Sequence, residues 1–504
     1  MRGSLLVAGT TSDAGKSVLT AALCRWLARR GVRVAPYKAQ NMANNSMVTA
    51  DGAEIGRAQW VQAIAAGAEP EAAMNPVLLK PGSDRRSHVV VMGRPFGEID
   101  ASSFAGERRT LADAAHAAYD DLRGRYDVVV CEGAGSPAEI NLRAHDFVNM
   151  GLARHGRIPT VVIGDIDRGG VFAALFGTTA LLSREDQALV GGYVLNKFRG
   201  DARLLDPGLR MLRSVTGRPV LGVVPWLPGV WLDSEDALDV KARSTVCEDE
   251  AVLRVAVVRL PRISNFTDVD ALGVEPNVDV RFVDTPDAVR DADLVVLPGT
   301  RATLADLGWL RERGLDRPLV RRSAQGRPVL GLCGGFQMLG ERIDDPDGVE
   351  SVRGQQTEGL GLLPACTRFH TQKTLRRPAG TWRNTAVTGY EIHHGRVVAD
   401  DGEPFLGGVR SGPVWGTLWH GALENDAFRR AWLAEVAAQA GRTDFVPAPD
   451  TCFAALRTAR LDLLADAVEE HLDTDALLAL VEYGAPAGLP FVAPGAPAVN
   501  ATTL

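Results

Sequence analysis

Cysteine is scarce in this chain, and the few cysteines stand far apart. The 504 residues include six cysteines, and no two of them form a Cys-x-x-Cys pair. This spacing argues against a disulfide framework and against a structural zinc site, because both need clustered thiols. The pattern leaves room for one cysteine that acts as a nucleophile.

Long hydrophobic runs are also missing. No stretch reaches the about 20 apolar residues of a membrane-spanning helix, and the opening residues lack the apolar core and cleavage site of a secretory signal. We therefore expect a cytoplasmic protein with no membrane partner. The formal net charge is −7, so an excess of positive charge is missing too, and we expect no nucleic-acid partner. The oligomeric state stays open.

Short apolar runs that alternate with helical stretches are what the chain has instead. They lie at residues 5–8, 128–131, 160–163, 192–195 and 220–224, and again at 255–260, 278–283, 294–297 and 329–332. Continuous apolar strands separated by helices are typical of a parallel sheet that is covered on both faces. Because the chain is too long for one hydrophobic core, the two series predict two α/β domains.

Changes in composition give the expected boundaries. We predict a first domain over residues 1–240, an acidic linker over 241–250 and a second domain over 251–445. An amphipathic helical extension follows over 446–484. Two roles stay open for its apolar face, namely packing on the core and forming an interface with a partner. The tail over 485–504 is rich in Pro, Gly and Ala and is expected to be poorly ordered.

A glycine-rich turn follows the first predicted strand and leads into a helix. It runs from Gly9 to Ser17 and reads Gly-Thr-Thr-Ser-Asp-Ala-Gly-Lys-Ser. Backbone N–H groups in such a turn cradle phosphate, the lysine reaches the β and γ oxygens, and the serine hydroxyl binds Mg²⁺. Its glycine spacing is one residue longer than usual and resembles the loop of dethiobiotin synthetase. We predict that ATP is bound by Gly9, Thr10, Asp13, Gly15, Lys16 and Ser17.

Two other strand ends carry polar residues suited to a nucleotide site. Glu132 ends an apolar run and is followed by Gly-Ala-Gly, so it is predicted to bind Mg²⁺ together with Ser17. An exposed glutamate on a glycine turn is the alternative. Asn196 ends another strand and is predicted to face the nucleotide base, although any polar residue at a strand end would show the same pattern.

The second half contains a cysteine between a strand and a helix. Cys333 lies in Gly-Leu-Cys-Gly-Gly, and this Gly-x-Cys-x-Gly pattern permits the sharp elbow that raises a nucleophile above a sheet. His420 follows a strand-like stretch and is the predicted base, with His393 and His394 as competitors. The N–H of Gly334 and the turn at residues 298–300 are expected to form an oxyanion hole. Hydrolysis of a glutamine amide through a thioester is the predicted reaction.

Longer motifs in both halves are more specific. They lie at residues 37–42, 54–59, 74–81, 164–172 and 195–201. On these motifs the chain resembles the cobyric acid synthase family, from the first strand to about residue 445. The resemblance implies a doubly wound phosphate-loop domain like that of dethiobiotin synthetase and a class I glutamine amidotransferase domain. It also implies ATP and Mg²⁺ as cofactors, and glutamine and a corrinoid as substrates.

The resemblance further implies a reaction. It is the ATP-dependent amidation of the b, d, e and g carboxylates of adenosylcobyrinic a,c-diamide to adenosylcobyric acid. Related amidotransferases carry an acid two residues after the histidine base, where this chain has Ala422. A Cys333–His420 dyad remains, with Glu391 or Glu424 as conceivable groups to orient the imidazole.

Two other functions remain in competition. A cobyrinic acid a,c-diamide synthase would share both halves, but the motifs at residues 38–41 and 75–81 argue against it. A nucleotide-switch ATPase with an inert amidotransferase-like domain is the alternative from another class. The presence of both Cys333 and His420 argues against an inert domain.

Overall fold

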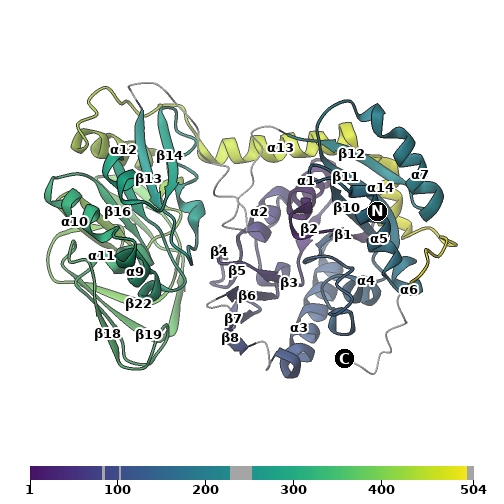
Figure 1. Cartoon of the computed structure of the whole chain (residues 1–504), viewed down its shortest axis with the longest axis horizontal. Coiled ribbons are helices and arrows are strands. Elements are labelled where there is room, and N and C mark those ends of the chain that lie inside the picture. The colour runs from purple at the N-terminus through teal and green to yellow at the C-terminus, as the bar shows by residue number, and fades with distance from the viewer. Residues whose placement is uncertain (82–85, 101–103, 228–251, 496–504) are drawn as a thin grey trace.

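The computed structural model describes residues 1–81, 86–100, 104–227 and 252–495. These residues form two lobes, with one long helix crossing from one lobe to the other (Figure 1). The predicted linker over residues 241–250 lies outside the described residues. None of the described helices is both long and apolar enough to cross a membrane.

The first lobe is built on a six-stranded parallel sheet, which confirms the predicted doubly wound fold. The strand order is β12-β11-β10-β1-β9-β2. The strands are β1 (Gly3–Gly9), β2 (Val34–Tyr37), β9 (Val128–Glu132), β10 (Thr160–Asp165), β11 (Val190–Phe198) and β12 (Val220–Pro225). Successive side chains of β1 enter different cores, Leu6 on one face and Leu5 and Val7 on the other. Both faces are therefore covered, which is why these strands are continuously apolar.

Helices and small sheets complete this lobe. The helices are α1 (Lys16–Arg29), α2 (Arg57–Ala66), α3 (Phe104–Arg125), α4 (Met150–Gly156), α5 (Val171–Ala180), α6 (Arg184–Gln187) and α7 (Asp206–Thr216). A four-stranded sheet contains β3 (Gln40–Met42), β6 (Val77–Pro81), β7 (Arg86–Val91) and β8 (Arg94–Asp100). A separate pair contains β4 (Ser46–Val48) and β5 (Glu54–Gly56), and these short strands project toward the second lobe (Figure 1).

The second lobe contains a seven-stranded sheet of order β14-β13-β15-β16-β25-β24-β23. Its strands are β13 (Leu253–Val258), β14 (Val278–Val283), β15 (Leu294–Leu297), β16 (Val329–Leu332), β23 (Glu403–Phe405), β24 (Gly408–Ser411) and β25 (Val414–Thr417). The first four and β25 are parallel, whereas β24 and β23 are antiparallel to their neighbours. The helices are α8 (Pro286–Asp291), α9 (Thr303–Glu312), α10 (Asp316–Ala324), α11 (Gly334–Leu339) and α12 (Asp426–Gln439).

A second, mostly antiparallel sheet lies beside the seven-stranded one. It has the order β18-β17-β19-β22, with β17 (Arg342–Asp345), β18 (Gln355–Glu358), β19 (Ala365–Arg376) and β22 (Glu391–Ala399). A hairpin of β20 (Ala379–Trp382) and β21 (Thr385–Thr388) follows β19 in the chain. Strand β19 carries Lys373, which reaches the first lobe, as described below.

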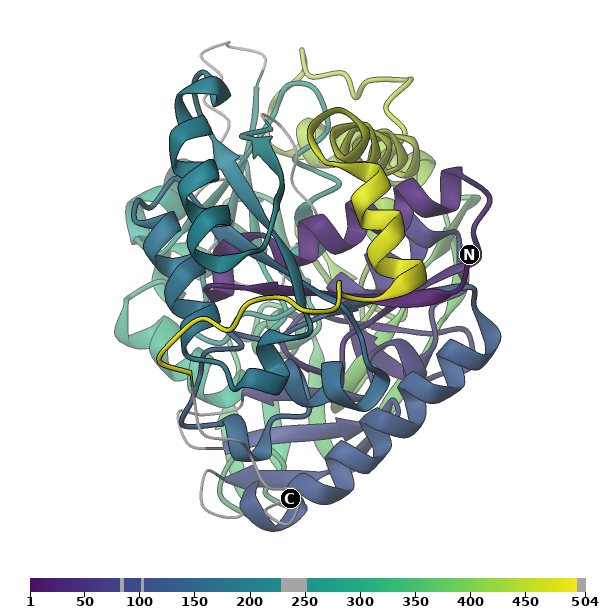
Figure 2. The same cartoon turned by 90° about the vertical axis from the view of Figure 1, so that its right-hand side faces the viewer.

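Two C-terminal helices pack on the first lobe although they follow the second lobe in sequence. Helix α13 (Phe453–His471) runs from the edge of the second lobe across the top of the first, and α14 (Thr474–Tyr483) lies against the first (Figures 1 and 2). The apolar face predicted for this region enters the core that contains α1, through Leu461, Leu464, Val468 and Leu472. Core packing is therefore the correct alternative for this face.

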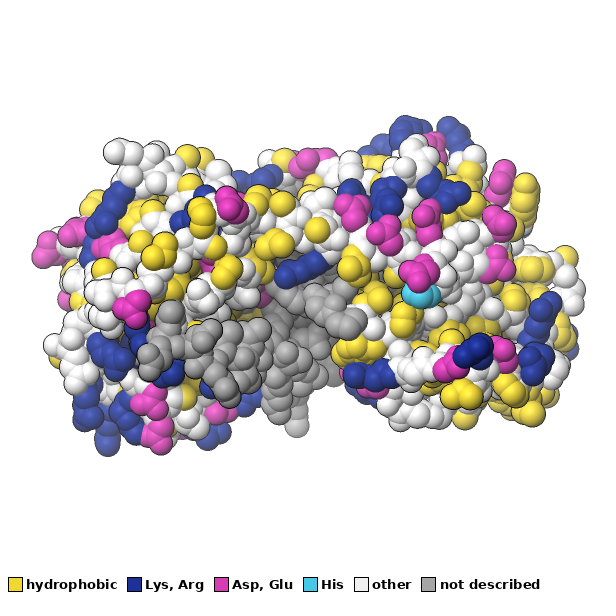
Figure 3. Space-filling view, turned by 90° about the horizontal axis from the view of Figure 1, so that it is seen from above, with side chains coloured by type: hydrophobic (Ala, Val, Ile, Leu, Met, Phe, Trp, Pro, Cys, Tyr) yellow, Lys and Arg dark blue, Asp and Glu magenta, His cyan; other side chains and the backbone are white. Residues whose placement is uncertain are grey.

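Charged pairs fix the same helix along its outer edge. Arg25 and Arg29 of α1, and Arg30 directly after it, contact Asp462, Asp466 and Glu469 of α13 at 2.8, 2.6 and 3.2 Å. Seen from above, the face that α13 crosses carries basic and acidic side chains interspersed (Figure 3).

The tail is ordered further than its composition predicts. Residues 485–495 run across the first lobe (Figure 2), and the backbone of Val492 makes two hydrogen bonds with the side chain of Gln187, at 2.8 and 2.9 Å. The guanidinium of Arg218 donates to the carbonyl of Pro490 at 2.7 Å, and Val492 is buried. Buried side chains thus bind the backbone of this segment, and composition alone does not reveal such contacts. Residues 496–504 lie outside the described part.

Candidate active sites

The glycine-rich turn lies at the carboxyl end of β1, where the predicted nucleotide site is expected. Strand β1 ends at Gly9, and the N–H of Thr10 donates to the carbonyl of Ile163 at 3.0 Å. Gly15 has a φ of 101°, and a Cβ there would lie 2.2 Å from the amide nitrogen of Asn196. Only glycine permits both this backbone conformation and this approach.

Side chains hold the turn in a fixed shape. The ammonium of Lys16 donates to the carbonyls of Thr11, Ser12 and Gly135 at 2.9, 3.0 and 3.1 Å. Asn196 donates to the carbonyl of Ala14 at 3.0 Å, and Lys197 donates to the carbonyl of Asp13 at 2.7 Å. The carboxylate of Asp13 pairs with Arg168 at 2.6 Å. Asn196 therefore supports the turn directly, while its contact with a nucleotide base stays a prediction.

Glu132 is buried at the end of β9 and makes three polar contacts. Its carboxylate accepts from the Ser17 hydroxyl at 2.7 Å, the Lys38 ammonium at 2.9 Å and the Gln62 amide at 2.6 Å. Burial alone would raise the pKa of Glu132, but Lys38 and the hydrogen bonds hold it below its usual value. The carboxylate is therefore ionised, and the alternative of an exposed glutamate is wrong.

The Ser17 and Glu132 oxygens fit a magnesium site. Mg²⁺ prefers oxygen ligands and takes one or two from protein side chains, with the rest from phosphate and water. Ser17 and Glu132 supply two such oxygens that already lie side by side. In the described ranges, no group of three or more His, Cys, Asp and Glu side chains is placed to bind a metal ion.

Cys333 forms the expected elbow between β16 and α11. Its φ of 50° and ψ of −108° are strained for a non-glycine residue. A Cβ on Gly335 would lie 2.0 Å from the carbonyl oxygen of Leu297, and one on Gly334 would lie 2.7 Å from Thr300. Both glycines are therefore required because the elbow packs directly against the turn that follows β15.

His420 has an acidic partner that sequence proximity does not reveal. Its Nδ1 contacts the carboxylate of Asp268 at 2.6 Å, and Asp268 also accepts from the N–H of Gly421 at 2.8 Å. Asp268 lies on a short 3-10 helix, Phe266–Val269, just after the first strand of the lobe. Burial alone would lower the pKa of His420, but Asp268 and Cys333 raise it to about 10. The geometry is that of a Cys–His–Asp triad.

The two glutamates considered as orienting groups contact other residues instead. Glu391 pairs with Arg376, and Glu424 bridges Arg57 at 2.7 Å and Arg457 at 2.9 Å. Both expectations were therefore wrong. The only available signal for Asp268 was a polar run at residues 264–270 after a predicted strand, at the carboxyl edge of the sheet.

A cavity of about 30 Å³ lies beside Cys333 and His420 and is lined by residues of both lobes. Arg301, Glu350 and Gln337 line it beside Cys333, together with both competing histidines, His393 and His394. Glu350 accepts from the N–H of Thr303 at 2.6 Å, and burial raises its pKa to about 7. The pKa of His394 is lowered to about 4 by burial and nearby cations. Asn44 and Lys80 of the first lobe complete the lining.

Buried charges connect the lobes at this cavity. Glu54 accepts from Lys80 of the first lobe at 2.6 Å and from Lys373 of the second at 2.5 Å. Burial alone would raise the pKa of Glu54, but the two ammonium groups hold it well below its usual value. The N–H of Ser46 also donates to Asn265 at 3.1 Å. The lobes are therefore joined by buried polar contacts immediately beside Cys333.

Comparisons with known proteins agree with both halves. Residues 5–239 match the CobQ/CobB/MinD/ParA nucleotide binding domain, and residues 254–428 match the CobB/CobQ-like glutamine amidotransferase domain. The cobyric acid synthase of Mycolicibacterium vanbaalenii is 64% identical over 497 residues, and that of Mycobacterium tuberculosis strain H37Rv is 64% identical over 500 residues. Each alignment covers 98% of this chain and 99% of the relative. Because this identity runs through both lobes and both sites, the chain belongs to the cobyric acid synthase family.

Proposed function

We propose that this chain amidates the b, d, e and g carboxylates of adenosylcobyrinic a,c-diamide to give adenosylcobyric acid, using ATP and glutamine. The observation that carries the proposal is the presence of two candidate sites in one chain. A phosphate loop with a buried carboxylate lies in one lobe, and Cys333 and His420, the latter in contact with Asp268, line a cavity that reaches both lobes.

The first site suits activation of a carboxylate. A carboxylate is a poor acyl donor until it is phosphorylated, so ATP must convert it to an acyl phosphate before ammonia can displace phosphate. Lys16 and the N–H groups of the turn bind the phosphates of ATP. Mg²⁺, bound by Ser17 and Glu132, would neutralise charge on the transferred phosphoryl group. Lys38 lies against Glu132 and fixes the carboxylate for that role.

The second site suits release of ammonia from glutamine. Cys333 attacks the carboxamide carbon, and the oxyanion that forms is stabilised by backbone N–H groups at Gly334 and the adjoining turn at Thr300. His420 is protonated at neutral pH because its pKa is raised to about 10, so it can donate a proton to the departing ammonia. Asp268 orients the ring. Water then hydrolyses the thioester and releases glutamate.

Glutamine recognition follows from the charges beside Cys333. Arg301 provides a cation for the α-carboxylate, and Glu350 provides a carboxylate for the α-amino group. An ammonium group near Glu350 would reverse the effect of burial on its pKa, so binding would ionise this side chain. Ammonia then leaves toward Asn44 and Lys80, on the side of the cavity that belongs to the first lobe.

The test is mass spectrometry of adenosylcobyrinic a,c-diamide after incubation with the protein, ATP, Mg²⁺ and glutamine. We expect four successive carboxyl-to-amide conversions. Cys333→Ala should abolish them with glutamine and retain them with ammonium salt, whereas Cys452→Ala, at an exposed cysteine, should behave as wild type. An unchanged corrinoid in the presence of continued ATP hydrolysis would contradict the substrate assignment and favour a nucleotide switch.

A further inference from the structure

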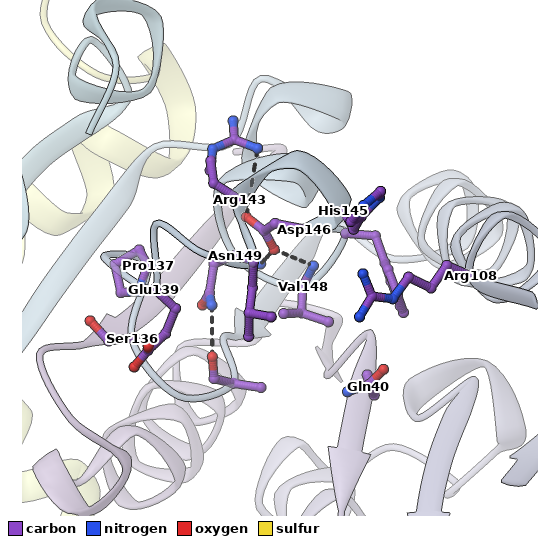
Figure 4. A pocket seen from close by; sticks show the side chains of 13 residues that line it. Gln40, Arg108, Ser136, Pro137, Glu139, Arg143, His145, Asp146, Val148 and Asn149 are labelled. Atoms are coloured by element: carbon purple, nitrogen blue, oxygen red, sulfur yellow. Dashed lines mark hydrogen bonds and ion pairs between the residues drawn. The ribbon is translucent and has the colours of Figure 1, made fainter. Parts of the chain in front are cut away.

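A second cavity lies beside the phosphate loop and is not part of either site described above. Its volume is about 110 Å³, and it is enclosed by α3, the segment of residues 134–149 and the start of β3 (Figure 4). Gln40, Arg108, Ser136, Glu139, His145 and Asn149 are among its lining residues. We propose that this cavity binds one carboxylate-bearing arm of the corrinoid substrate, next to the terminal phosphate of ATP. This inference rests on the proposed function.

The position of the cavity follows from the order of the sheet. Strand β1, which carries the phosphate loop, lies between β10 and β9, with β11 and Asn196 on one side and β9 and β2 on the other. If the base faces Asn196, the terminal phosphate points toward the β9 side. Lys16 contacts the carbonyl of Gly135 at 3.1 Å, and Ala134, the preceding residue, lines the cavity. The cavity therefore adjoins the place where phosphoryl transfer occurs.

The lining offers both donors and acceptors. The guanidinium of Arg108 and the amide of Gln40 point into the same space (Figure 4), and both can donate to a carboxylate. Asn149 is 4% exposed and donates to the carbonyl of Ala134 at 2.7 Å. Its Oδ1 is buried and has no partner among the described residues, and Glu139 adds an exposed acceptor.

This mixture matches a ligand whose carboxylates become amides one after another. A purely cationic cavity would bind the first substrate and reject the later ones, because amides are neutral and need an acceptor as well as a donor. Here a carboxylate can accept from Arg108 and Gln40, and an amide can also donate to the exposed carboxylate of Glu139. One cavity can therefore serve all the successive amidations.

The size of the cavity limits what enters it. The cavity has a volume of about 110 Å³, which suits one short side arm and leaves the macrocycle outside. Two large apolar side chains on the neighbouring segment are unusually exposed, Ile140 at 56% and Leu142 at 49%. Leu142 also lines the cavity. These side chains suit contact with the apolar face of the corrin ring while its arm reaches inward.

The experiment compares steady-state kinetics of Arg108→Ala with the matched control Arg109→Ala. Arg109 is the next residue of α3, is exposed and is not part of the cavity lining. With adenosylcobyrinic a,c-diamide as the varied substrate, Arg108→Ala should raise KM at least about tenfold, as expected for loss of a charge-assisted hydrogen bond. KM for ATP should change less than about twofold, and Arg109→Ala should match wild type in both.

Two further variants keep the cavity assignment testable if Arg108→Ala does not fold. Gln40→Ala and the double variant Ile140→Ser/Leu142→Ser should each raise KM for the corrinoid, and equilibrium dialysis of the corrinoid against each protein should show the same weakening. If wild type amidates the corrinoid and all three variants keep its KM, the cavity assignment is wrong. If wild type leaves the corrinoid unchanged while hydrolysing ATP, the proposed function itself is wrong, and the cavity assignment is overturned with it.

Discussion

Asp268 and His420 are in contact at 2.6 Å although 152 residues separate them in the sequence. Both side chains are buried, and Asp268 also accepts from the N–H that follows His420. The carboxylate thus fixes both the imidazole and the backbone that carries it. The 3-10 helix that carries Asp268 thus places an acid beside His420, although Ala422 stands at the position where the resemblance predicts one.

Replacing Asp268 should impair amidation with glutamine much more than amidation with ammonium salt. Asp268→Asn keeps the shape of the side chain but removes the negative charge that orients His420 and stabilises its protonated form. Glutamine-dependent amidation should therefore fall by about 100-fold or more. Amidation with ammonium salt should fall far less, since the phosphate loop is remote from this change. Both rates are measured by chromatography of the corrinoid products. Glu424→Gln serves as the comparison, and an equal loss there would contradict the assignment of Asp268.

The raised pKa of His420 predicts a dependence of stability on pH. Its pKa is about 10 in the folded chain and about 6.5 in an unfolded chain, so the proton is bound more tightly when the protein is folded. The resulting stabilisation is fully present below about pH 6.5 and is lost as the pH rises toward 10.

Calorimetry of the full chain checks this dependence. Asp268→Asn removes the charge that holds the proton, so the melting temperature of wild type minus that of the variant should be largest near about pH 6 and should shrink toward pH 10. A difference that stays constant or grows with pH would contradict a protonated His420.

Glu132→Gln should disable activation of the carboxylate. The change keeps the shape but removes a charge that contacts both Ser17 and Lys38, so amidation should fall by about 100-fold or more with either nitrogen source. The expected pattern differs from that of Cys333→Ala, in which ammonia restores the product. Glu185→Gln, at an exposed carboxylate of α6, is the control. Rescue of Glu132→Gln by ammonia would rule out its role at the ATP site.

Lys373→Met should loosen the connection between the lobes. It leaves Glu54 buried with only Lys80 as a cationic partner, which should cost about 3 kcal/mol and lower the melting temperature. We also expect more glutamine to be hydrolysed per amide formed, because ammonia escapes where the lobes separate. Arg368→Met, at an exposed position on the same strand, is the control. The double variant Glu54→Gln/Lys373→Met should recover part of the stability, and no recovery would contradict the pairing.

Features encoded by neighbouring residues could be predicted from the sequence. The glycine spacing around Gly15 and Cys333 predicts both sharp turns, because the backbone conformations and close approaches there are local requirements. The buried strands can be recognised in the sequence as continuous apolar runs, because both faces of each sheet are covered. Asp268 could not be assigned to His420, nor Glu54 to Lys373, because these pairs form only when distant segments meet. The order of residues 485–495 also depends on a distant partner, Gln187.

Helix α13 has a consequence for the way the chain is made. Leu461, Leu464 and Val468 belong to the same core as Leu5 and Val7, so the first lobe contains both ends of the described chain. During synthesis the phosphate loop leaves the ribosome long before these helical residues do. Since domains generally fold as units as they emerge, the second lobe can complete its own core before the first has all of its parts. The core on the α1 side of the first lobe can therefore be completed only after Leu461, Leu464 and Val468 have been translated, although α1 itself is among the first segments made.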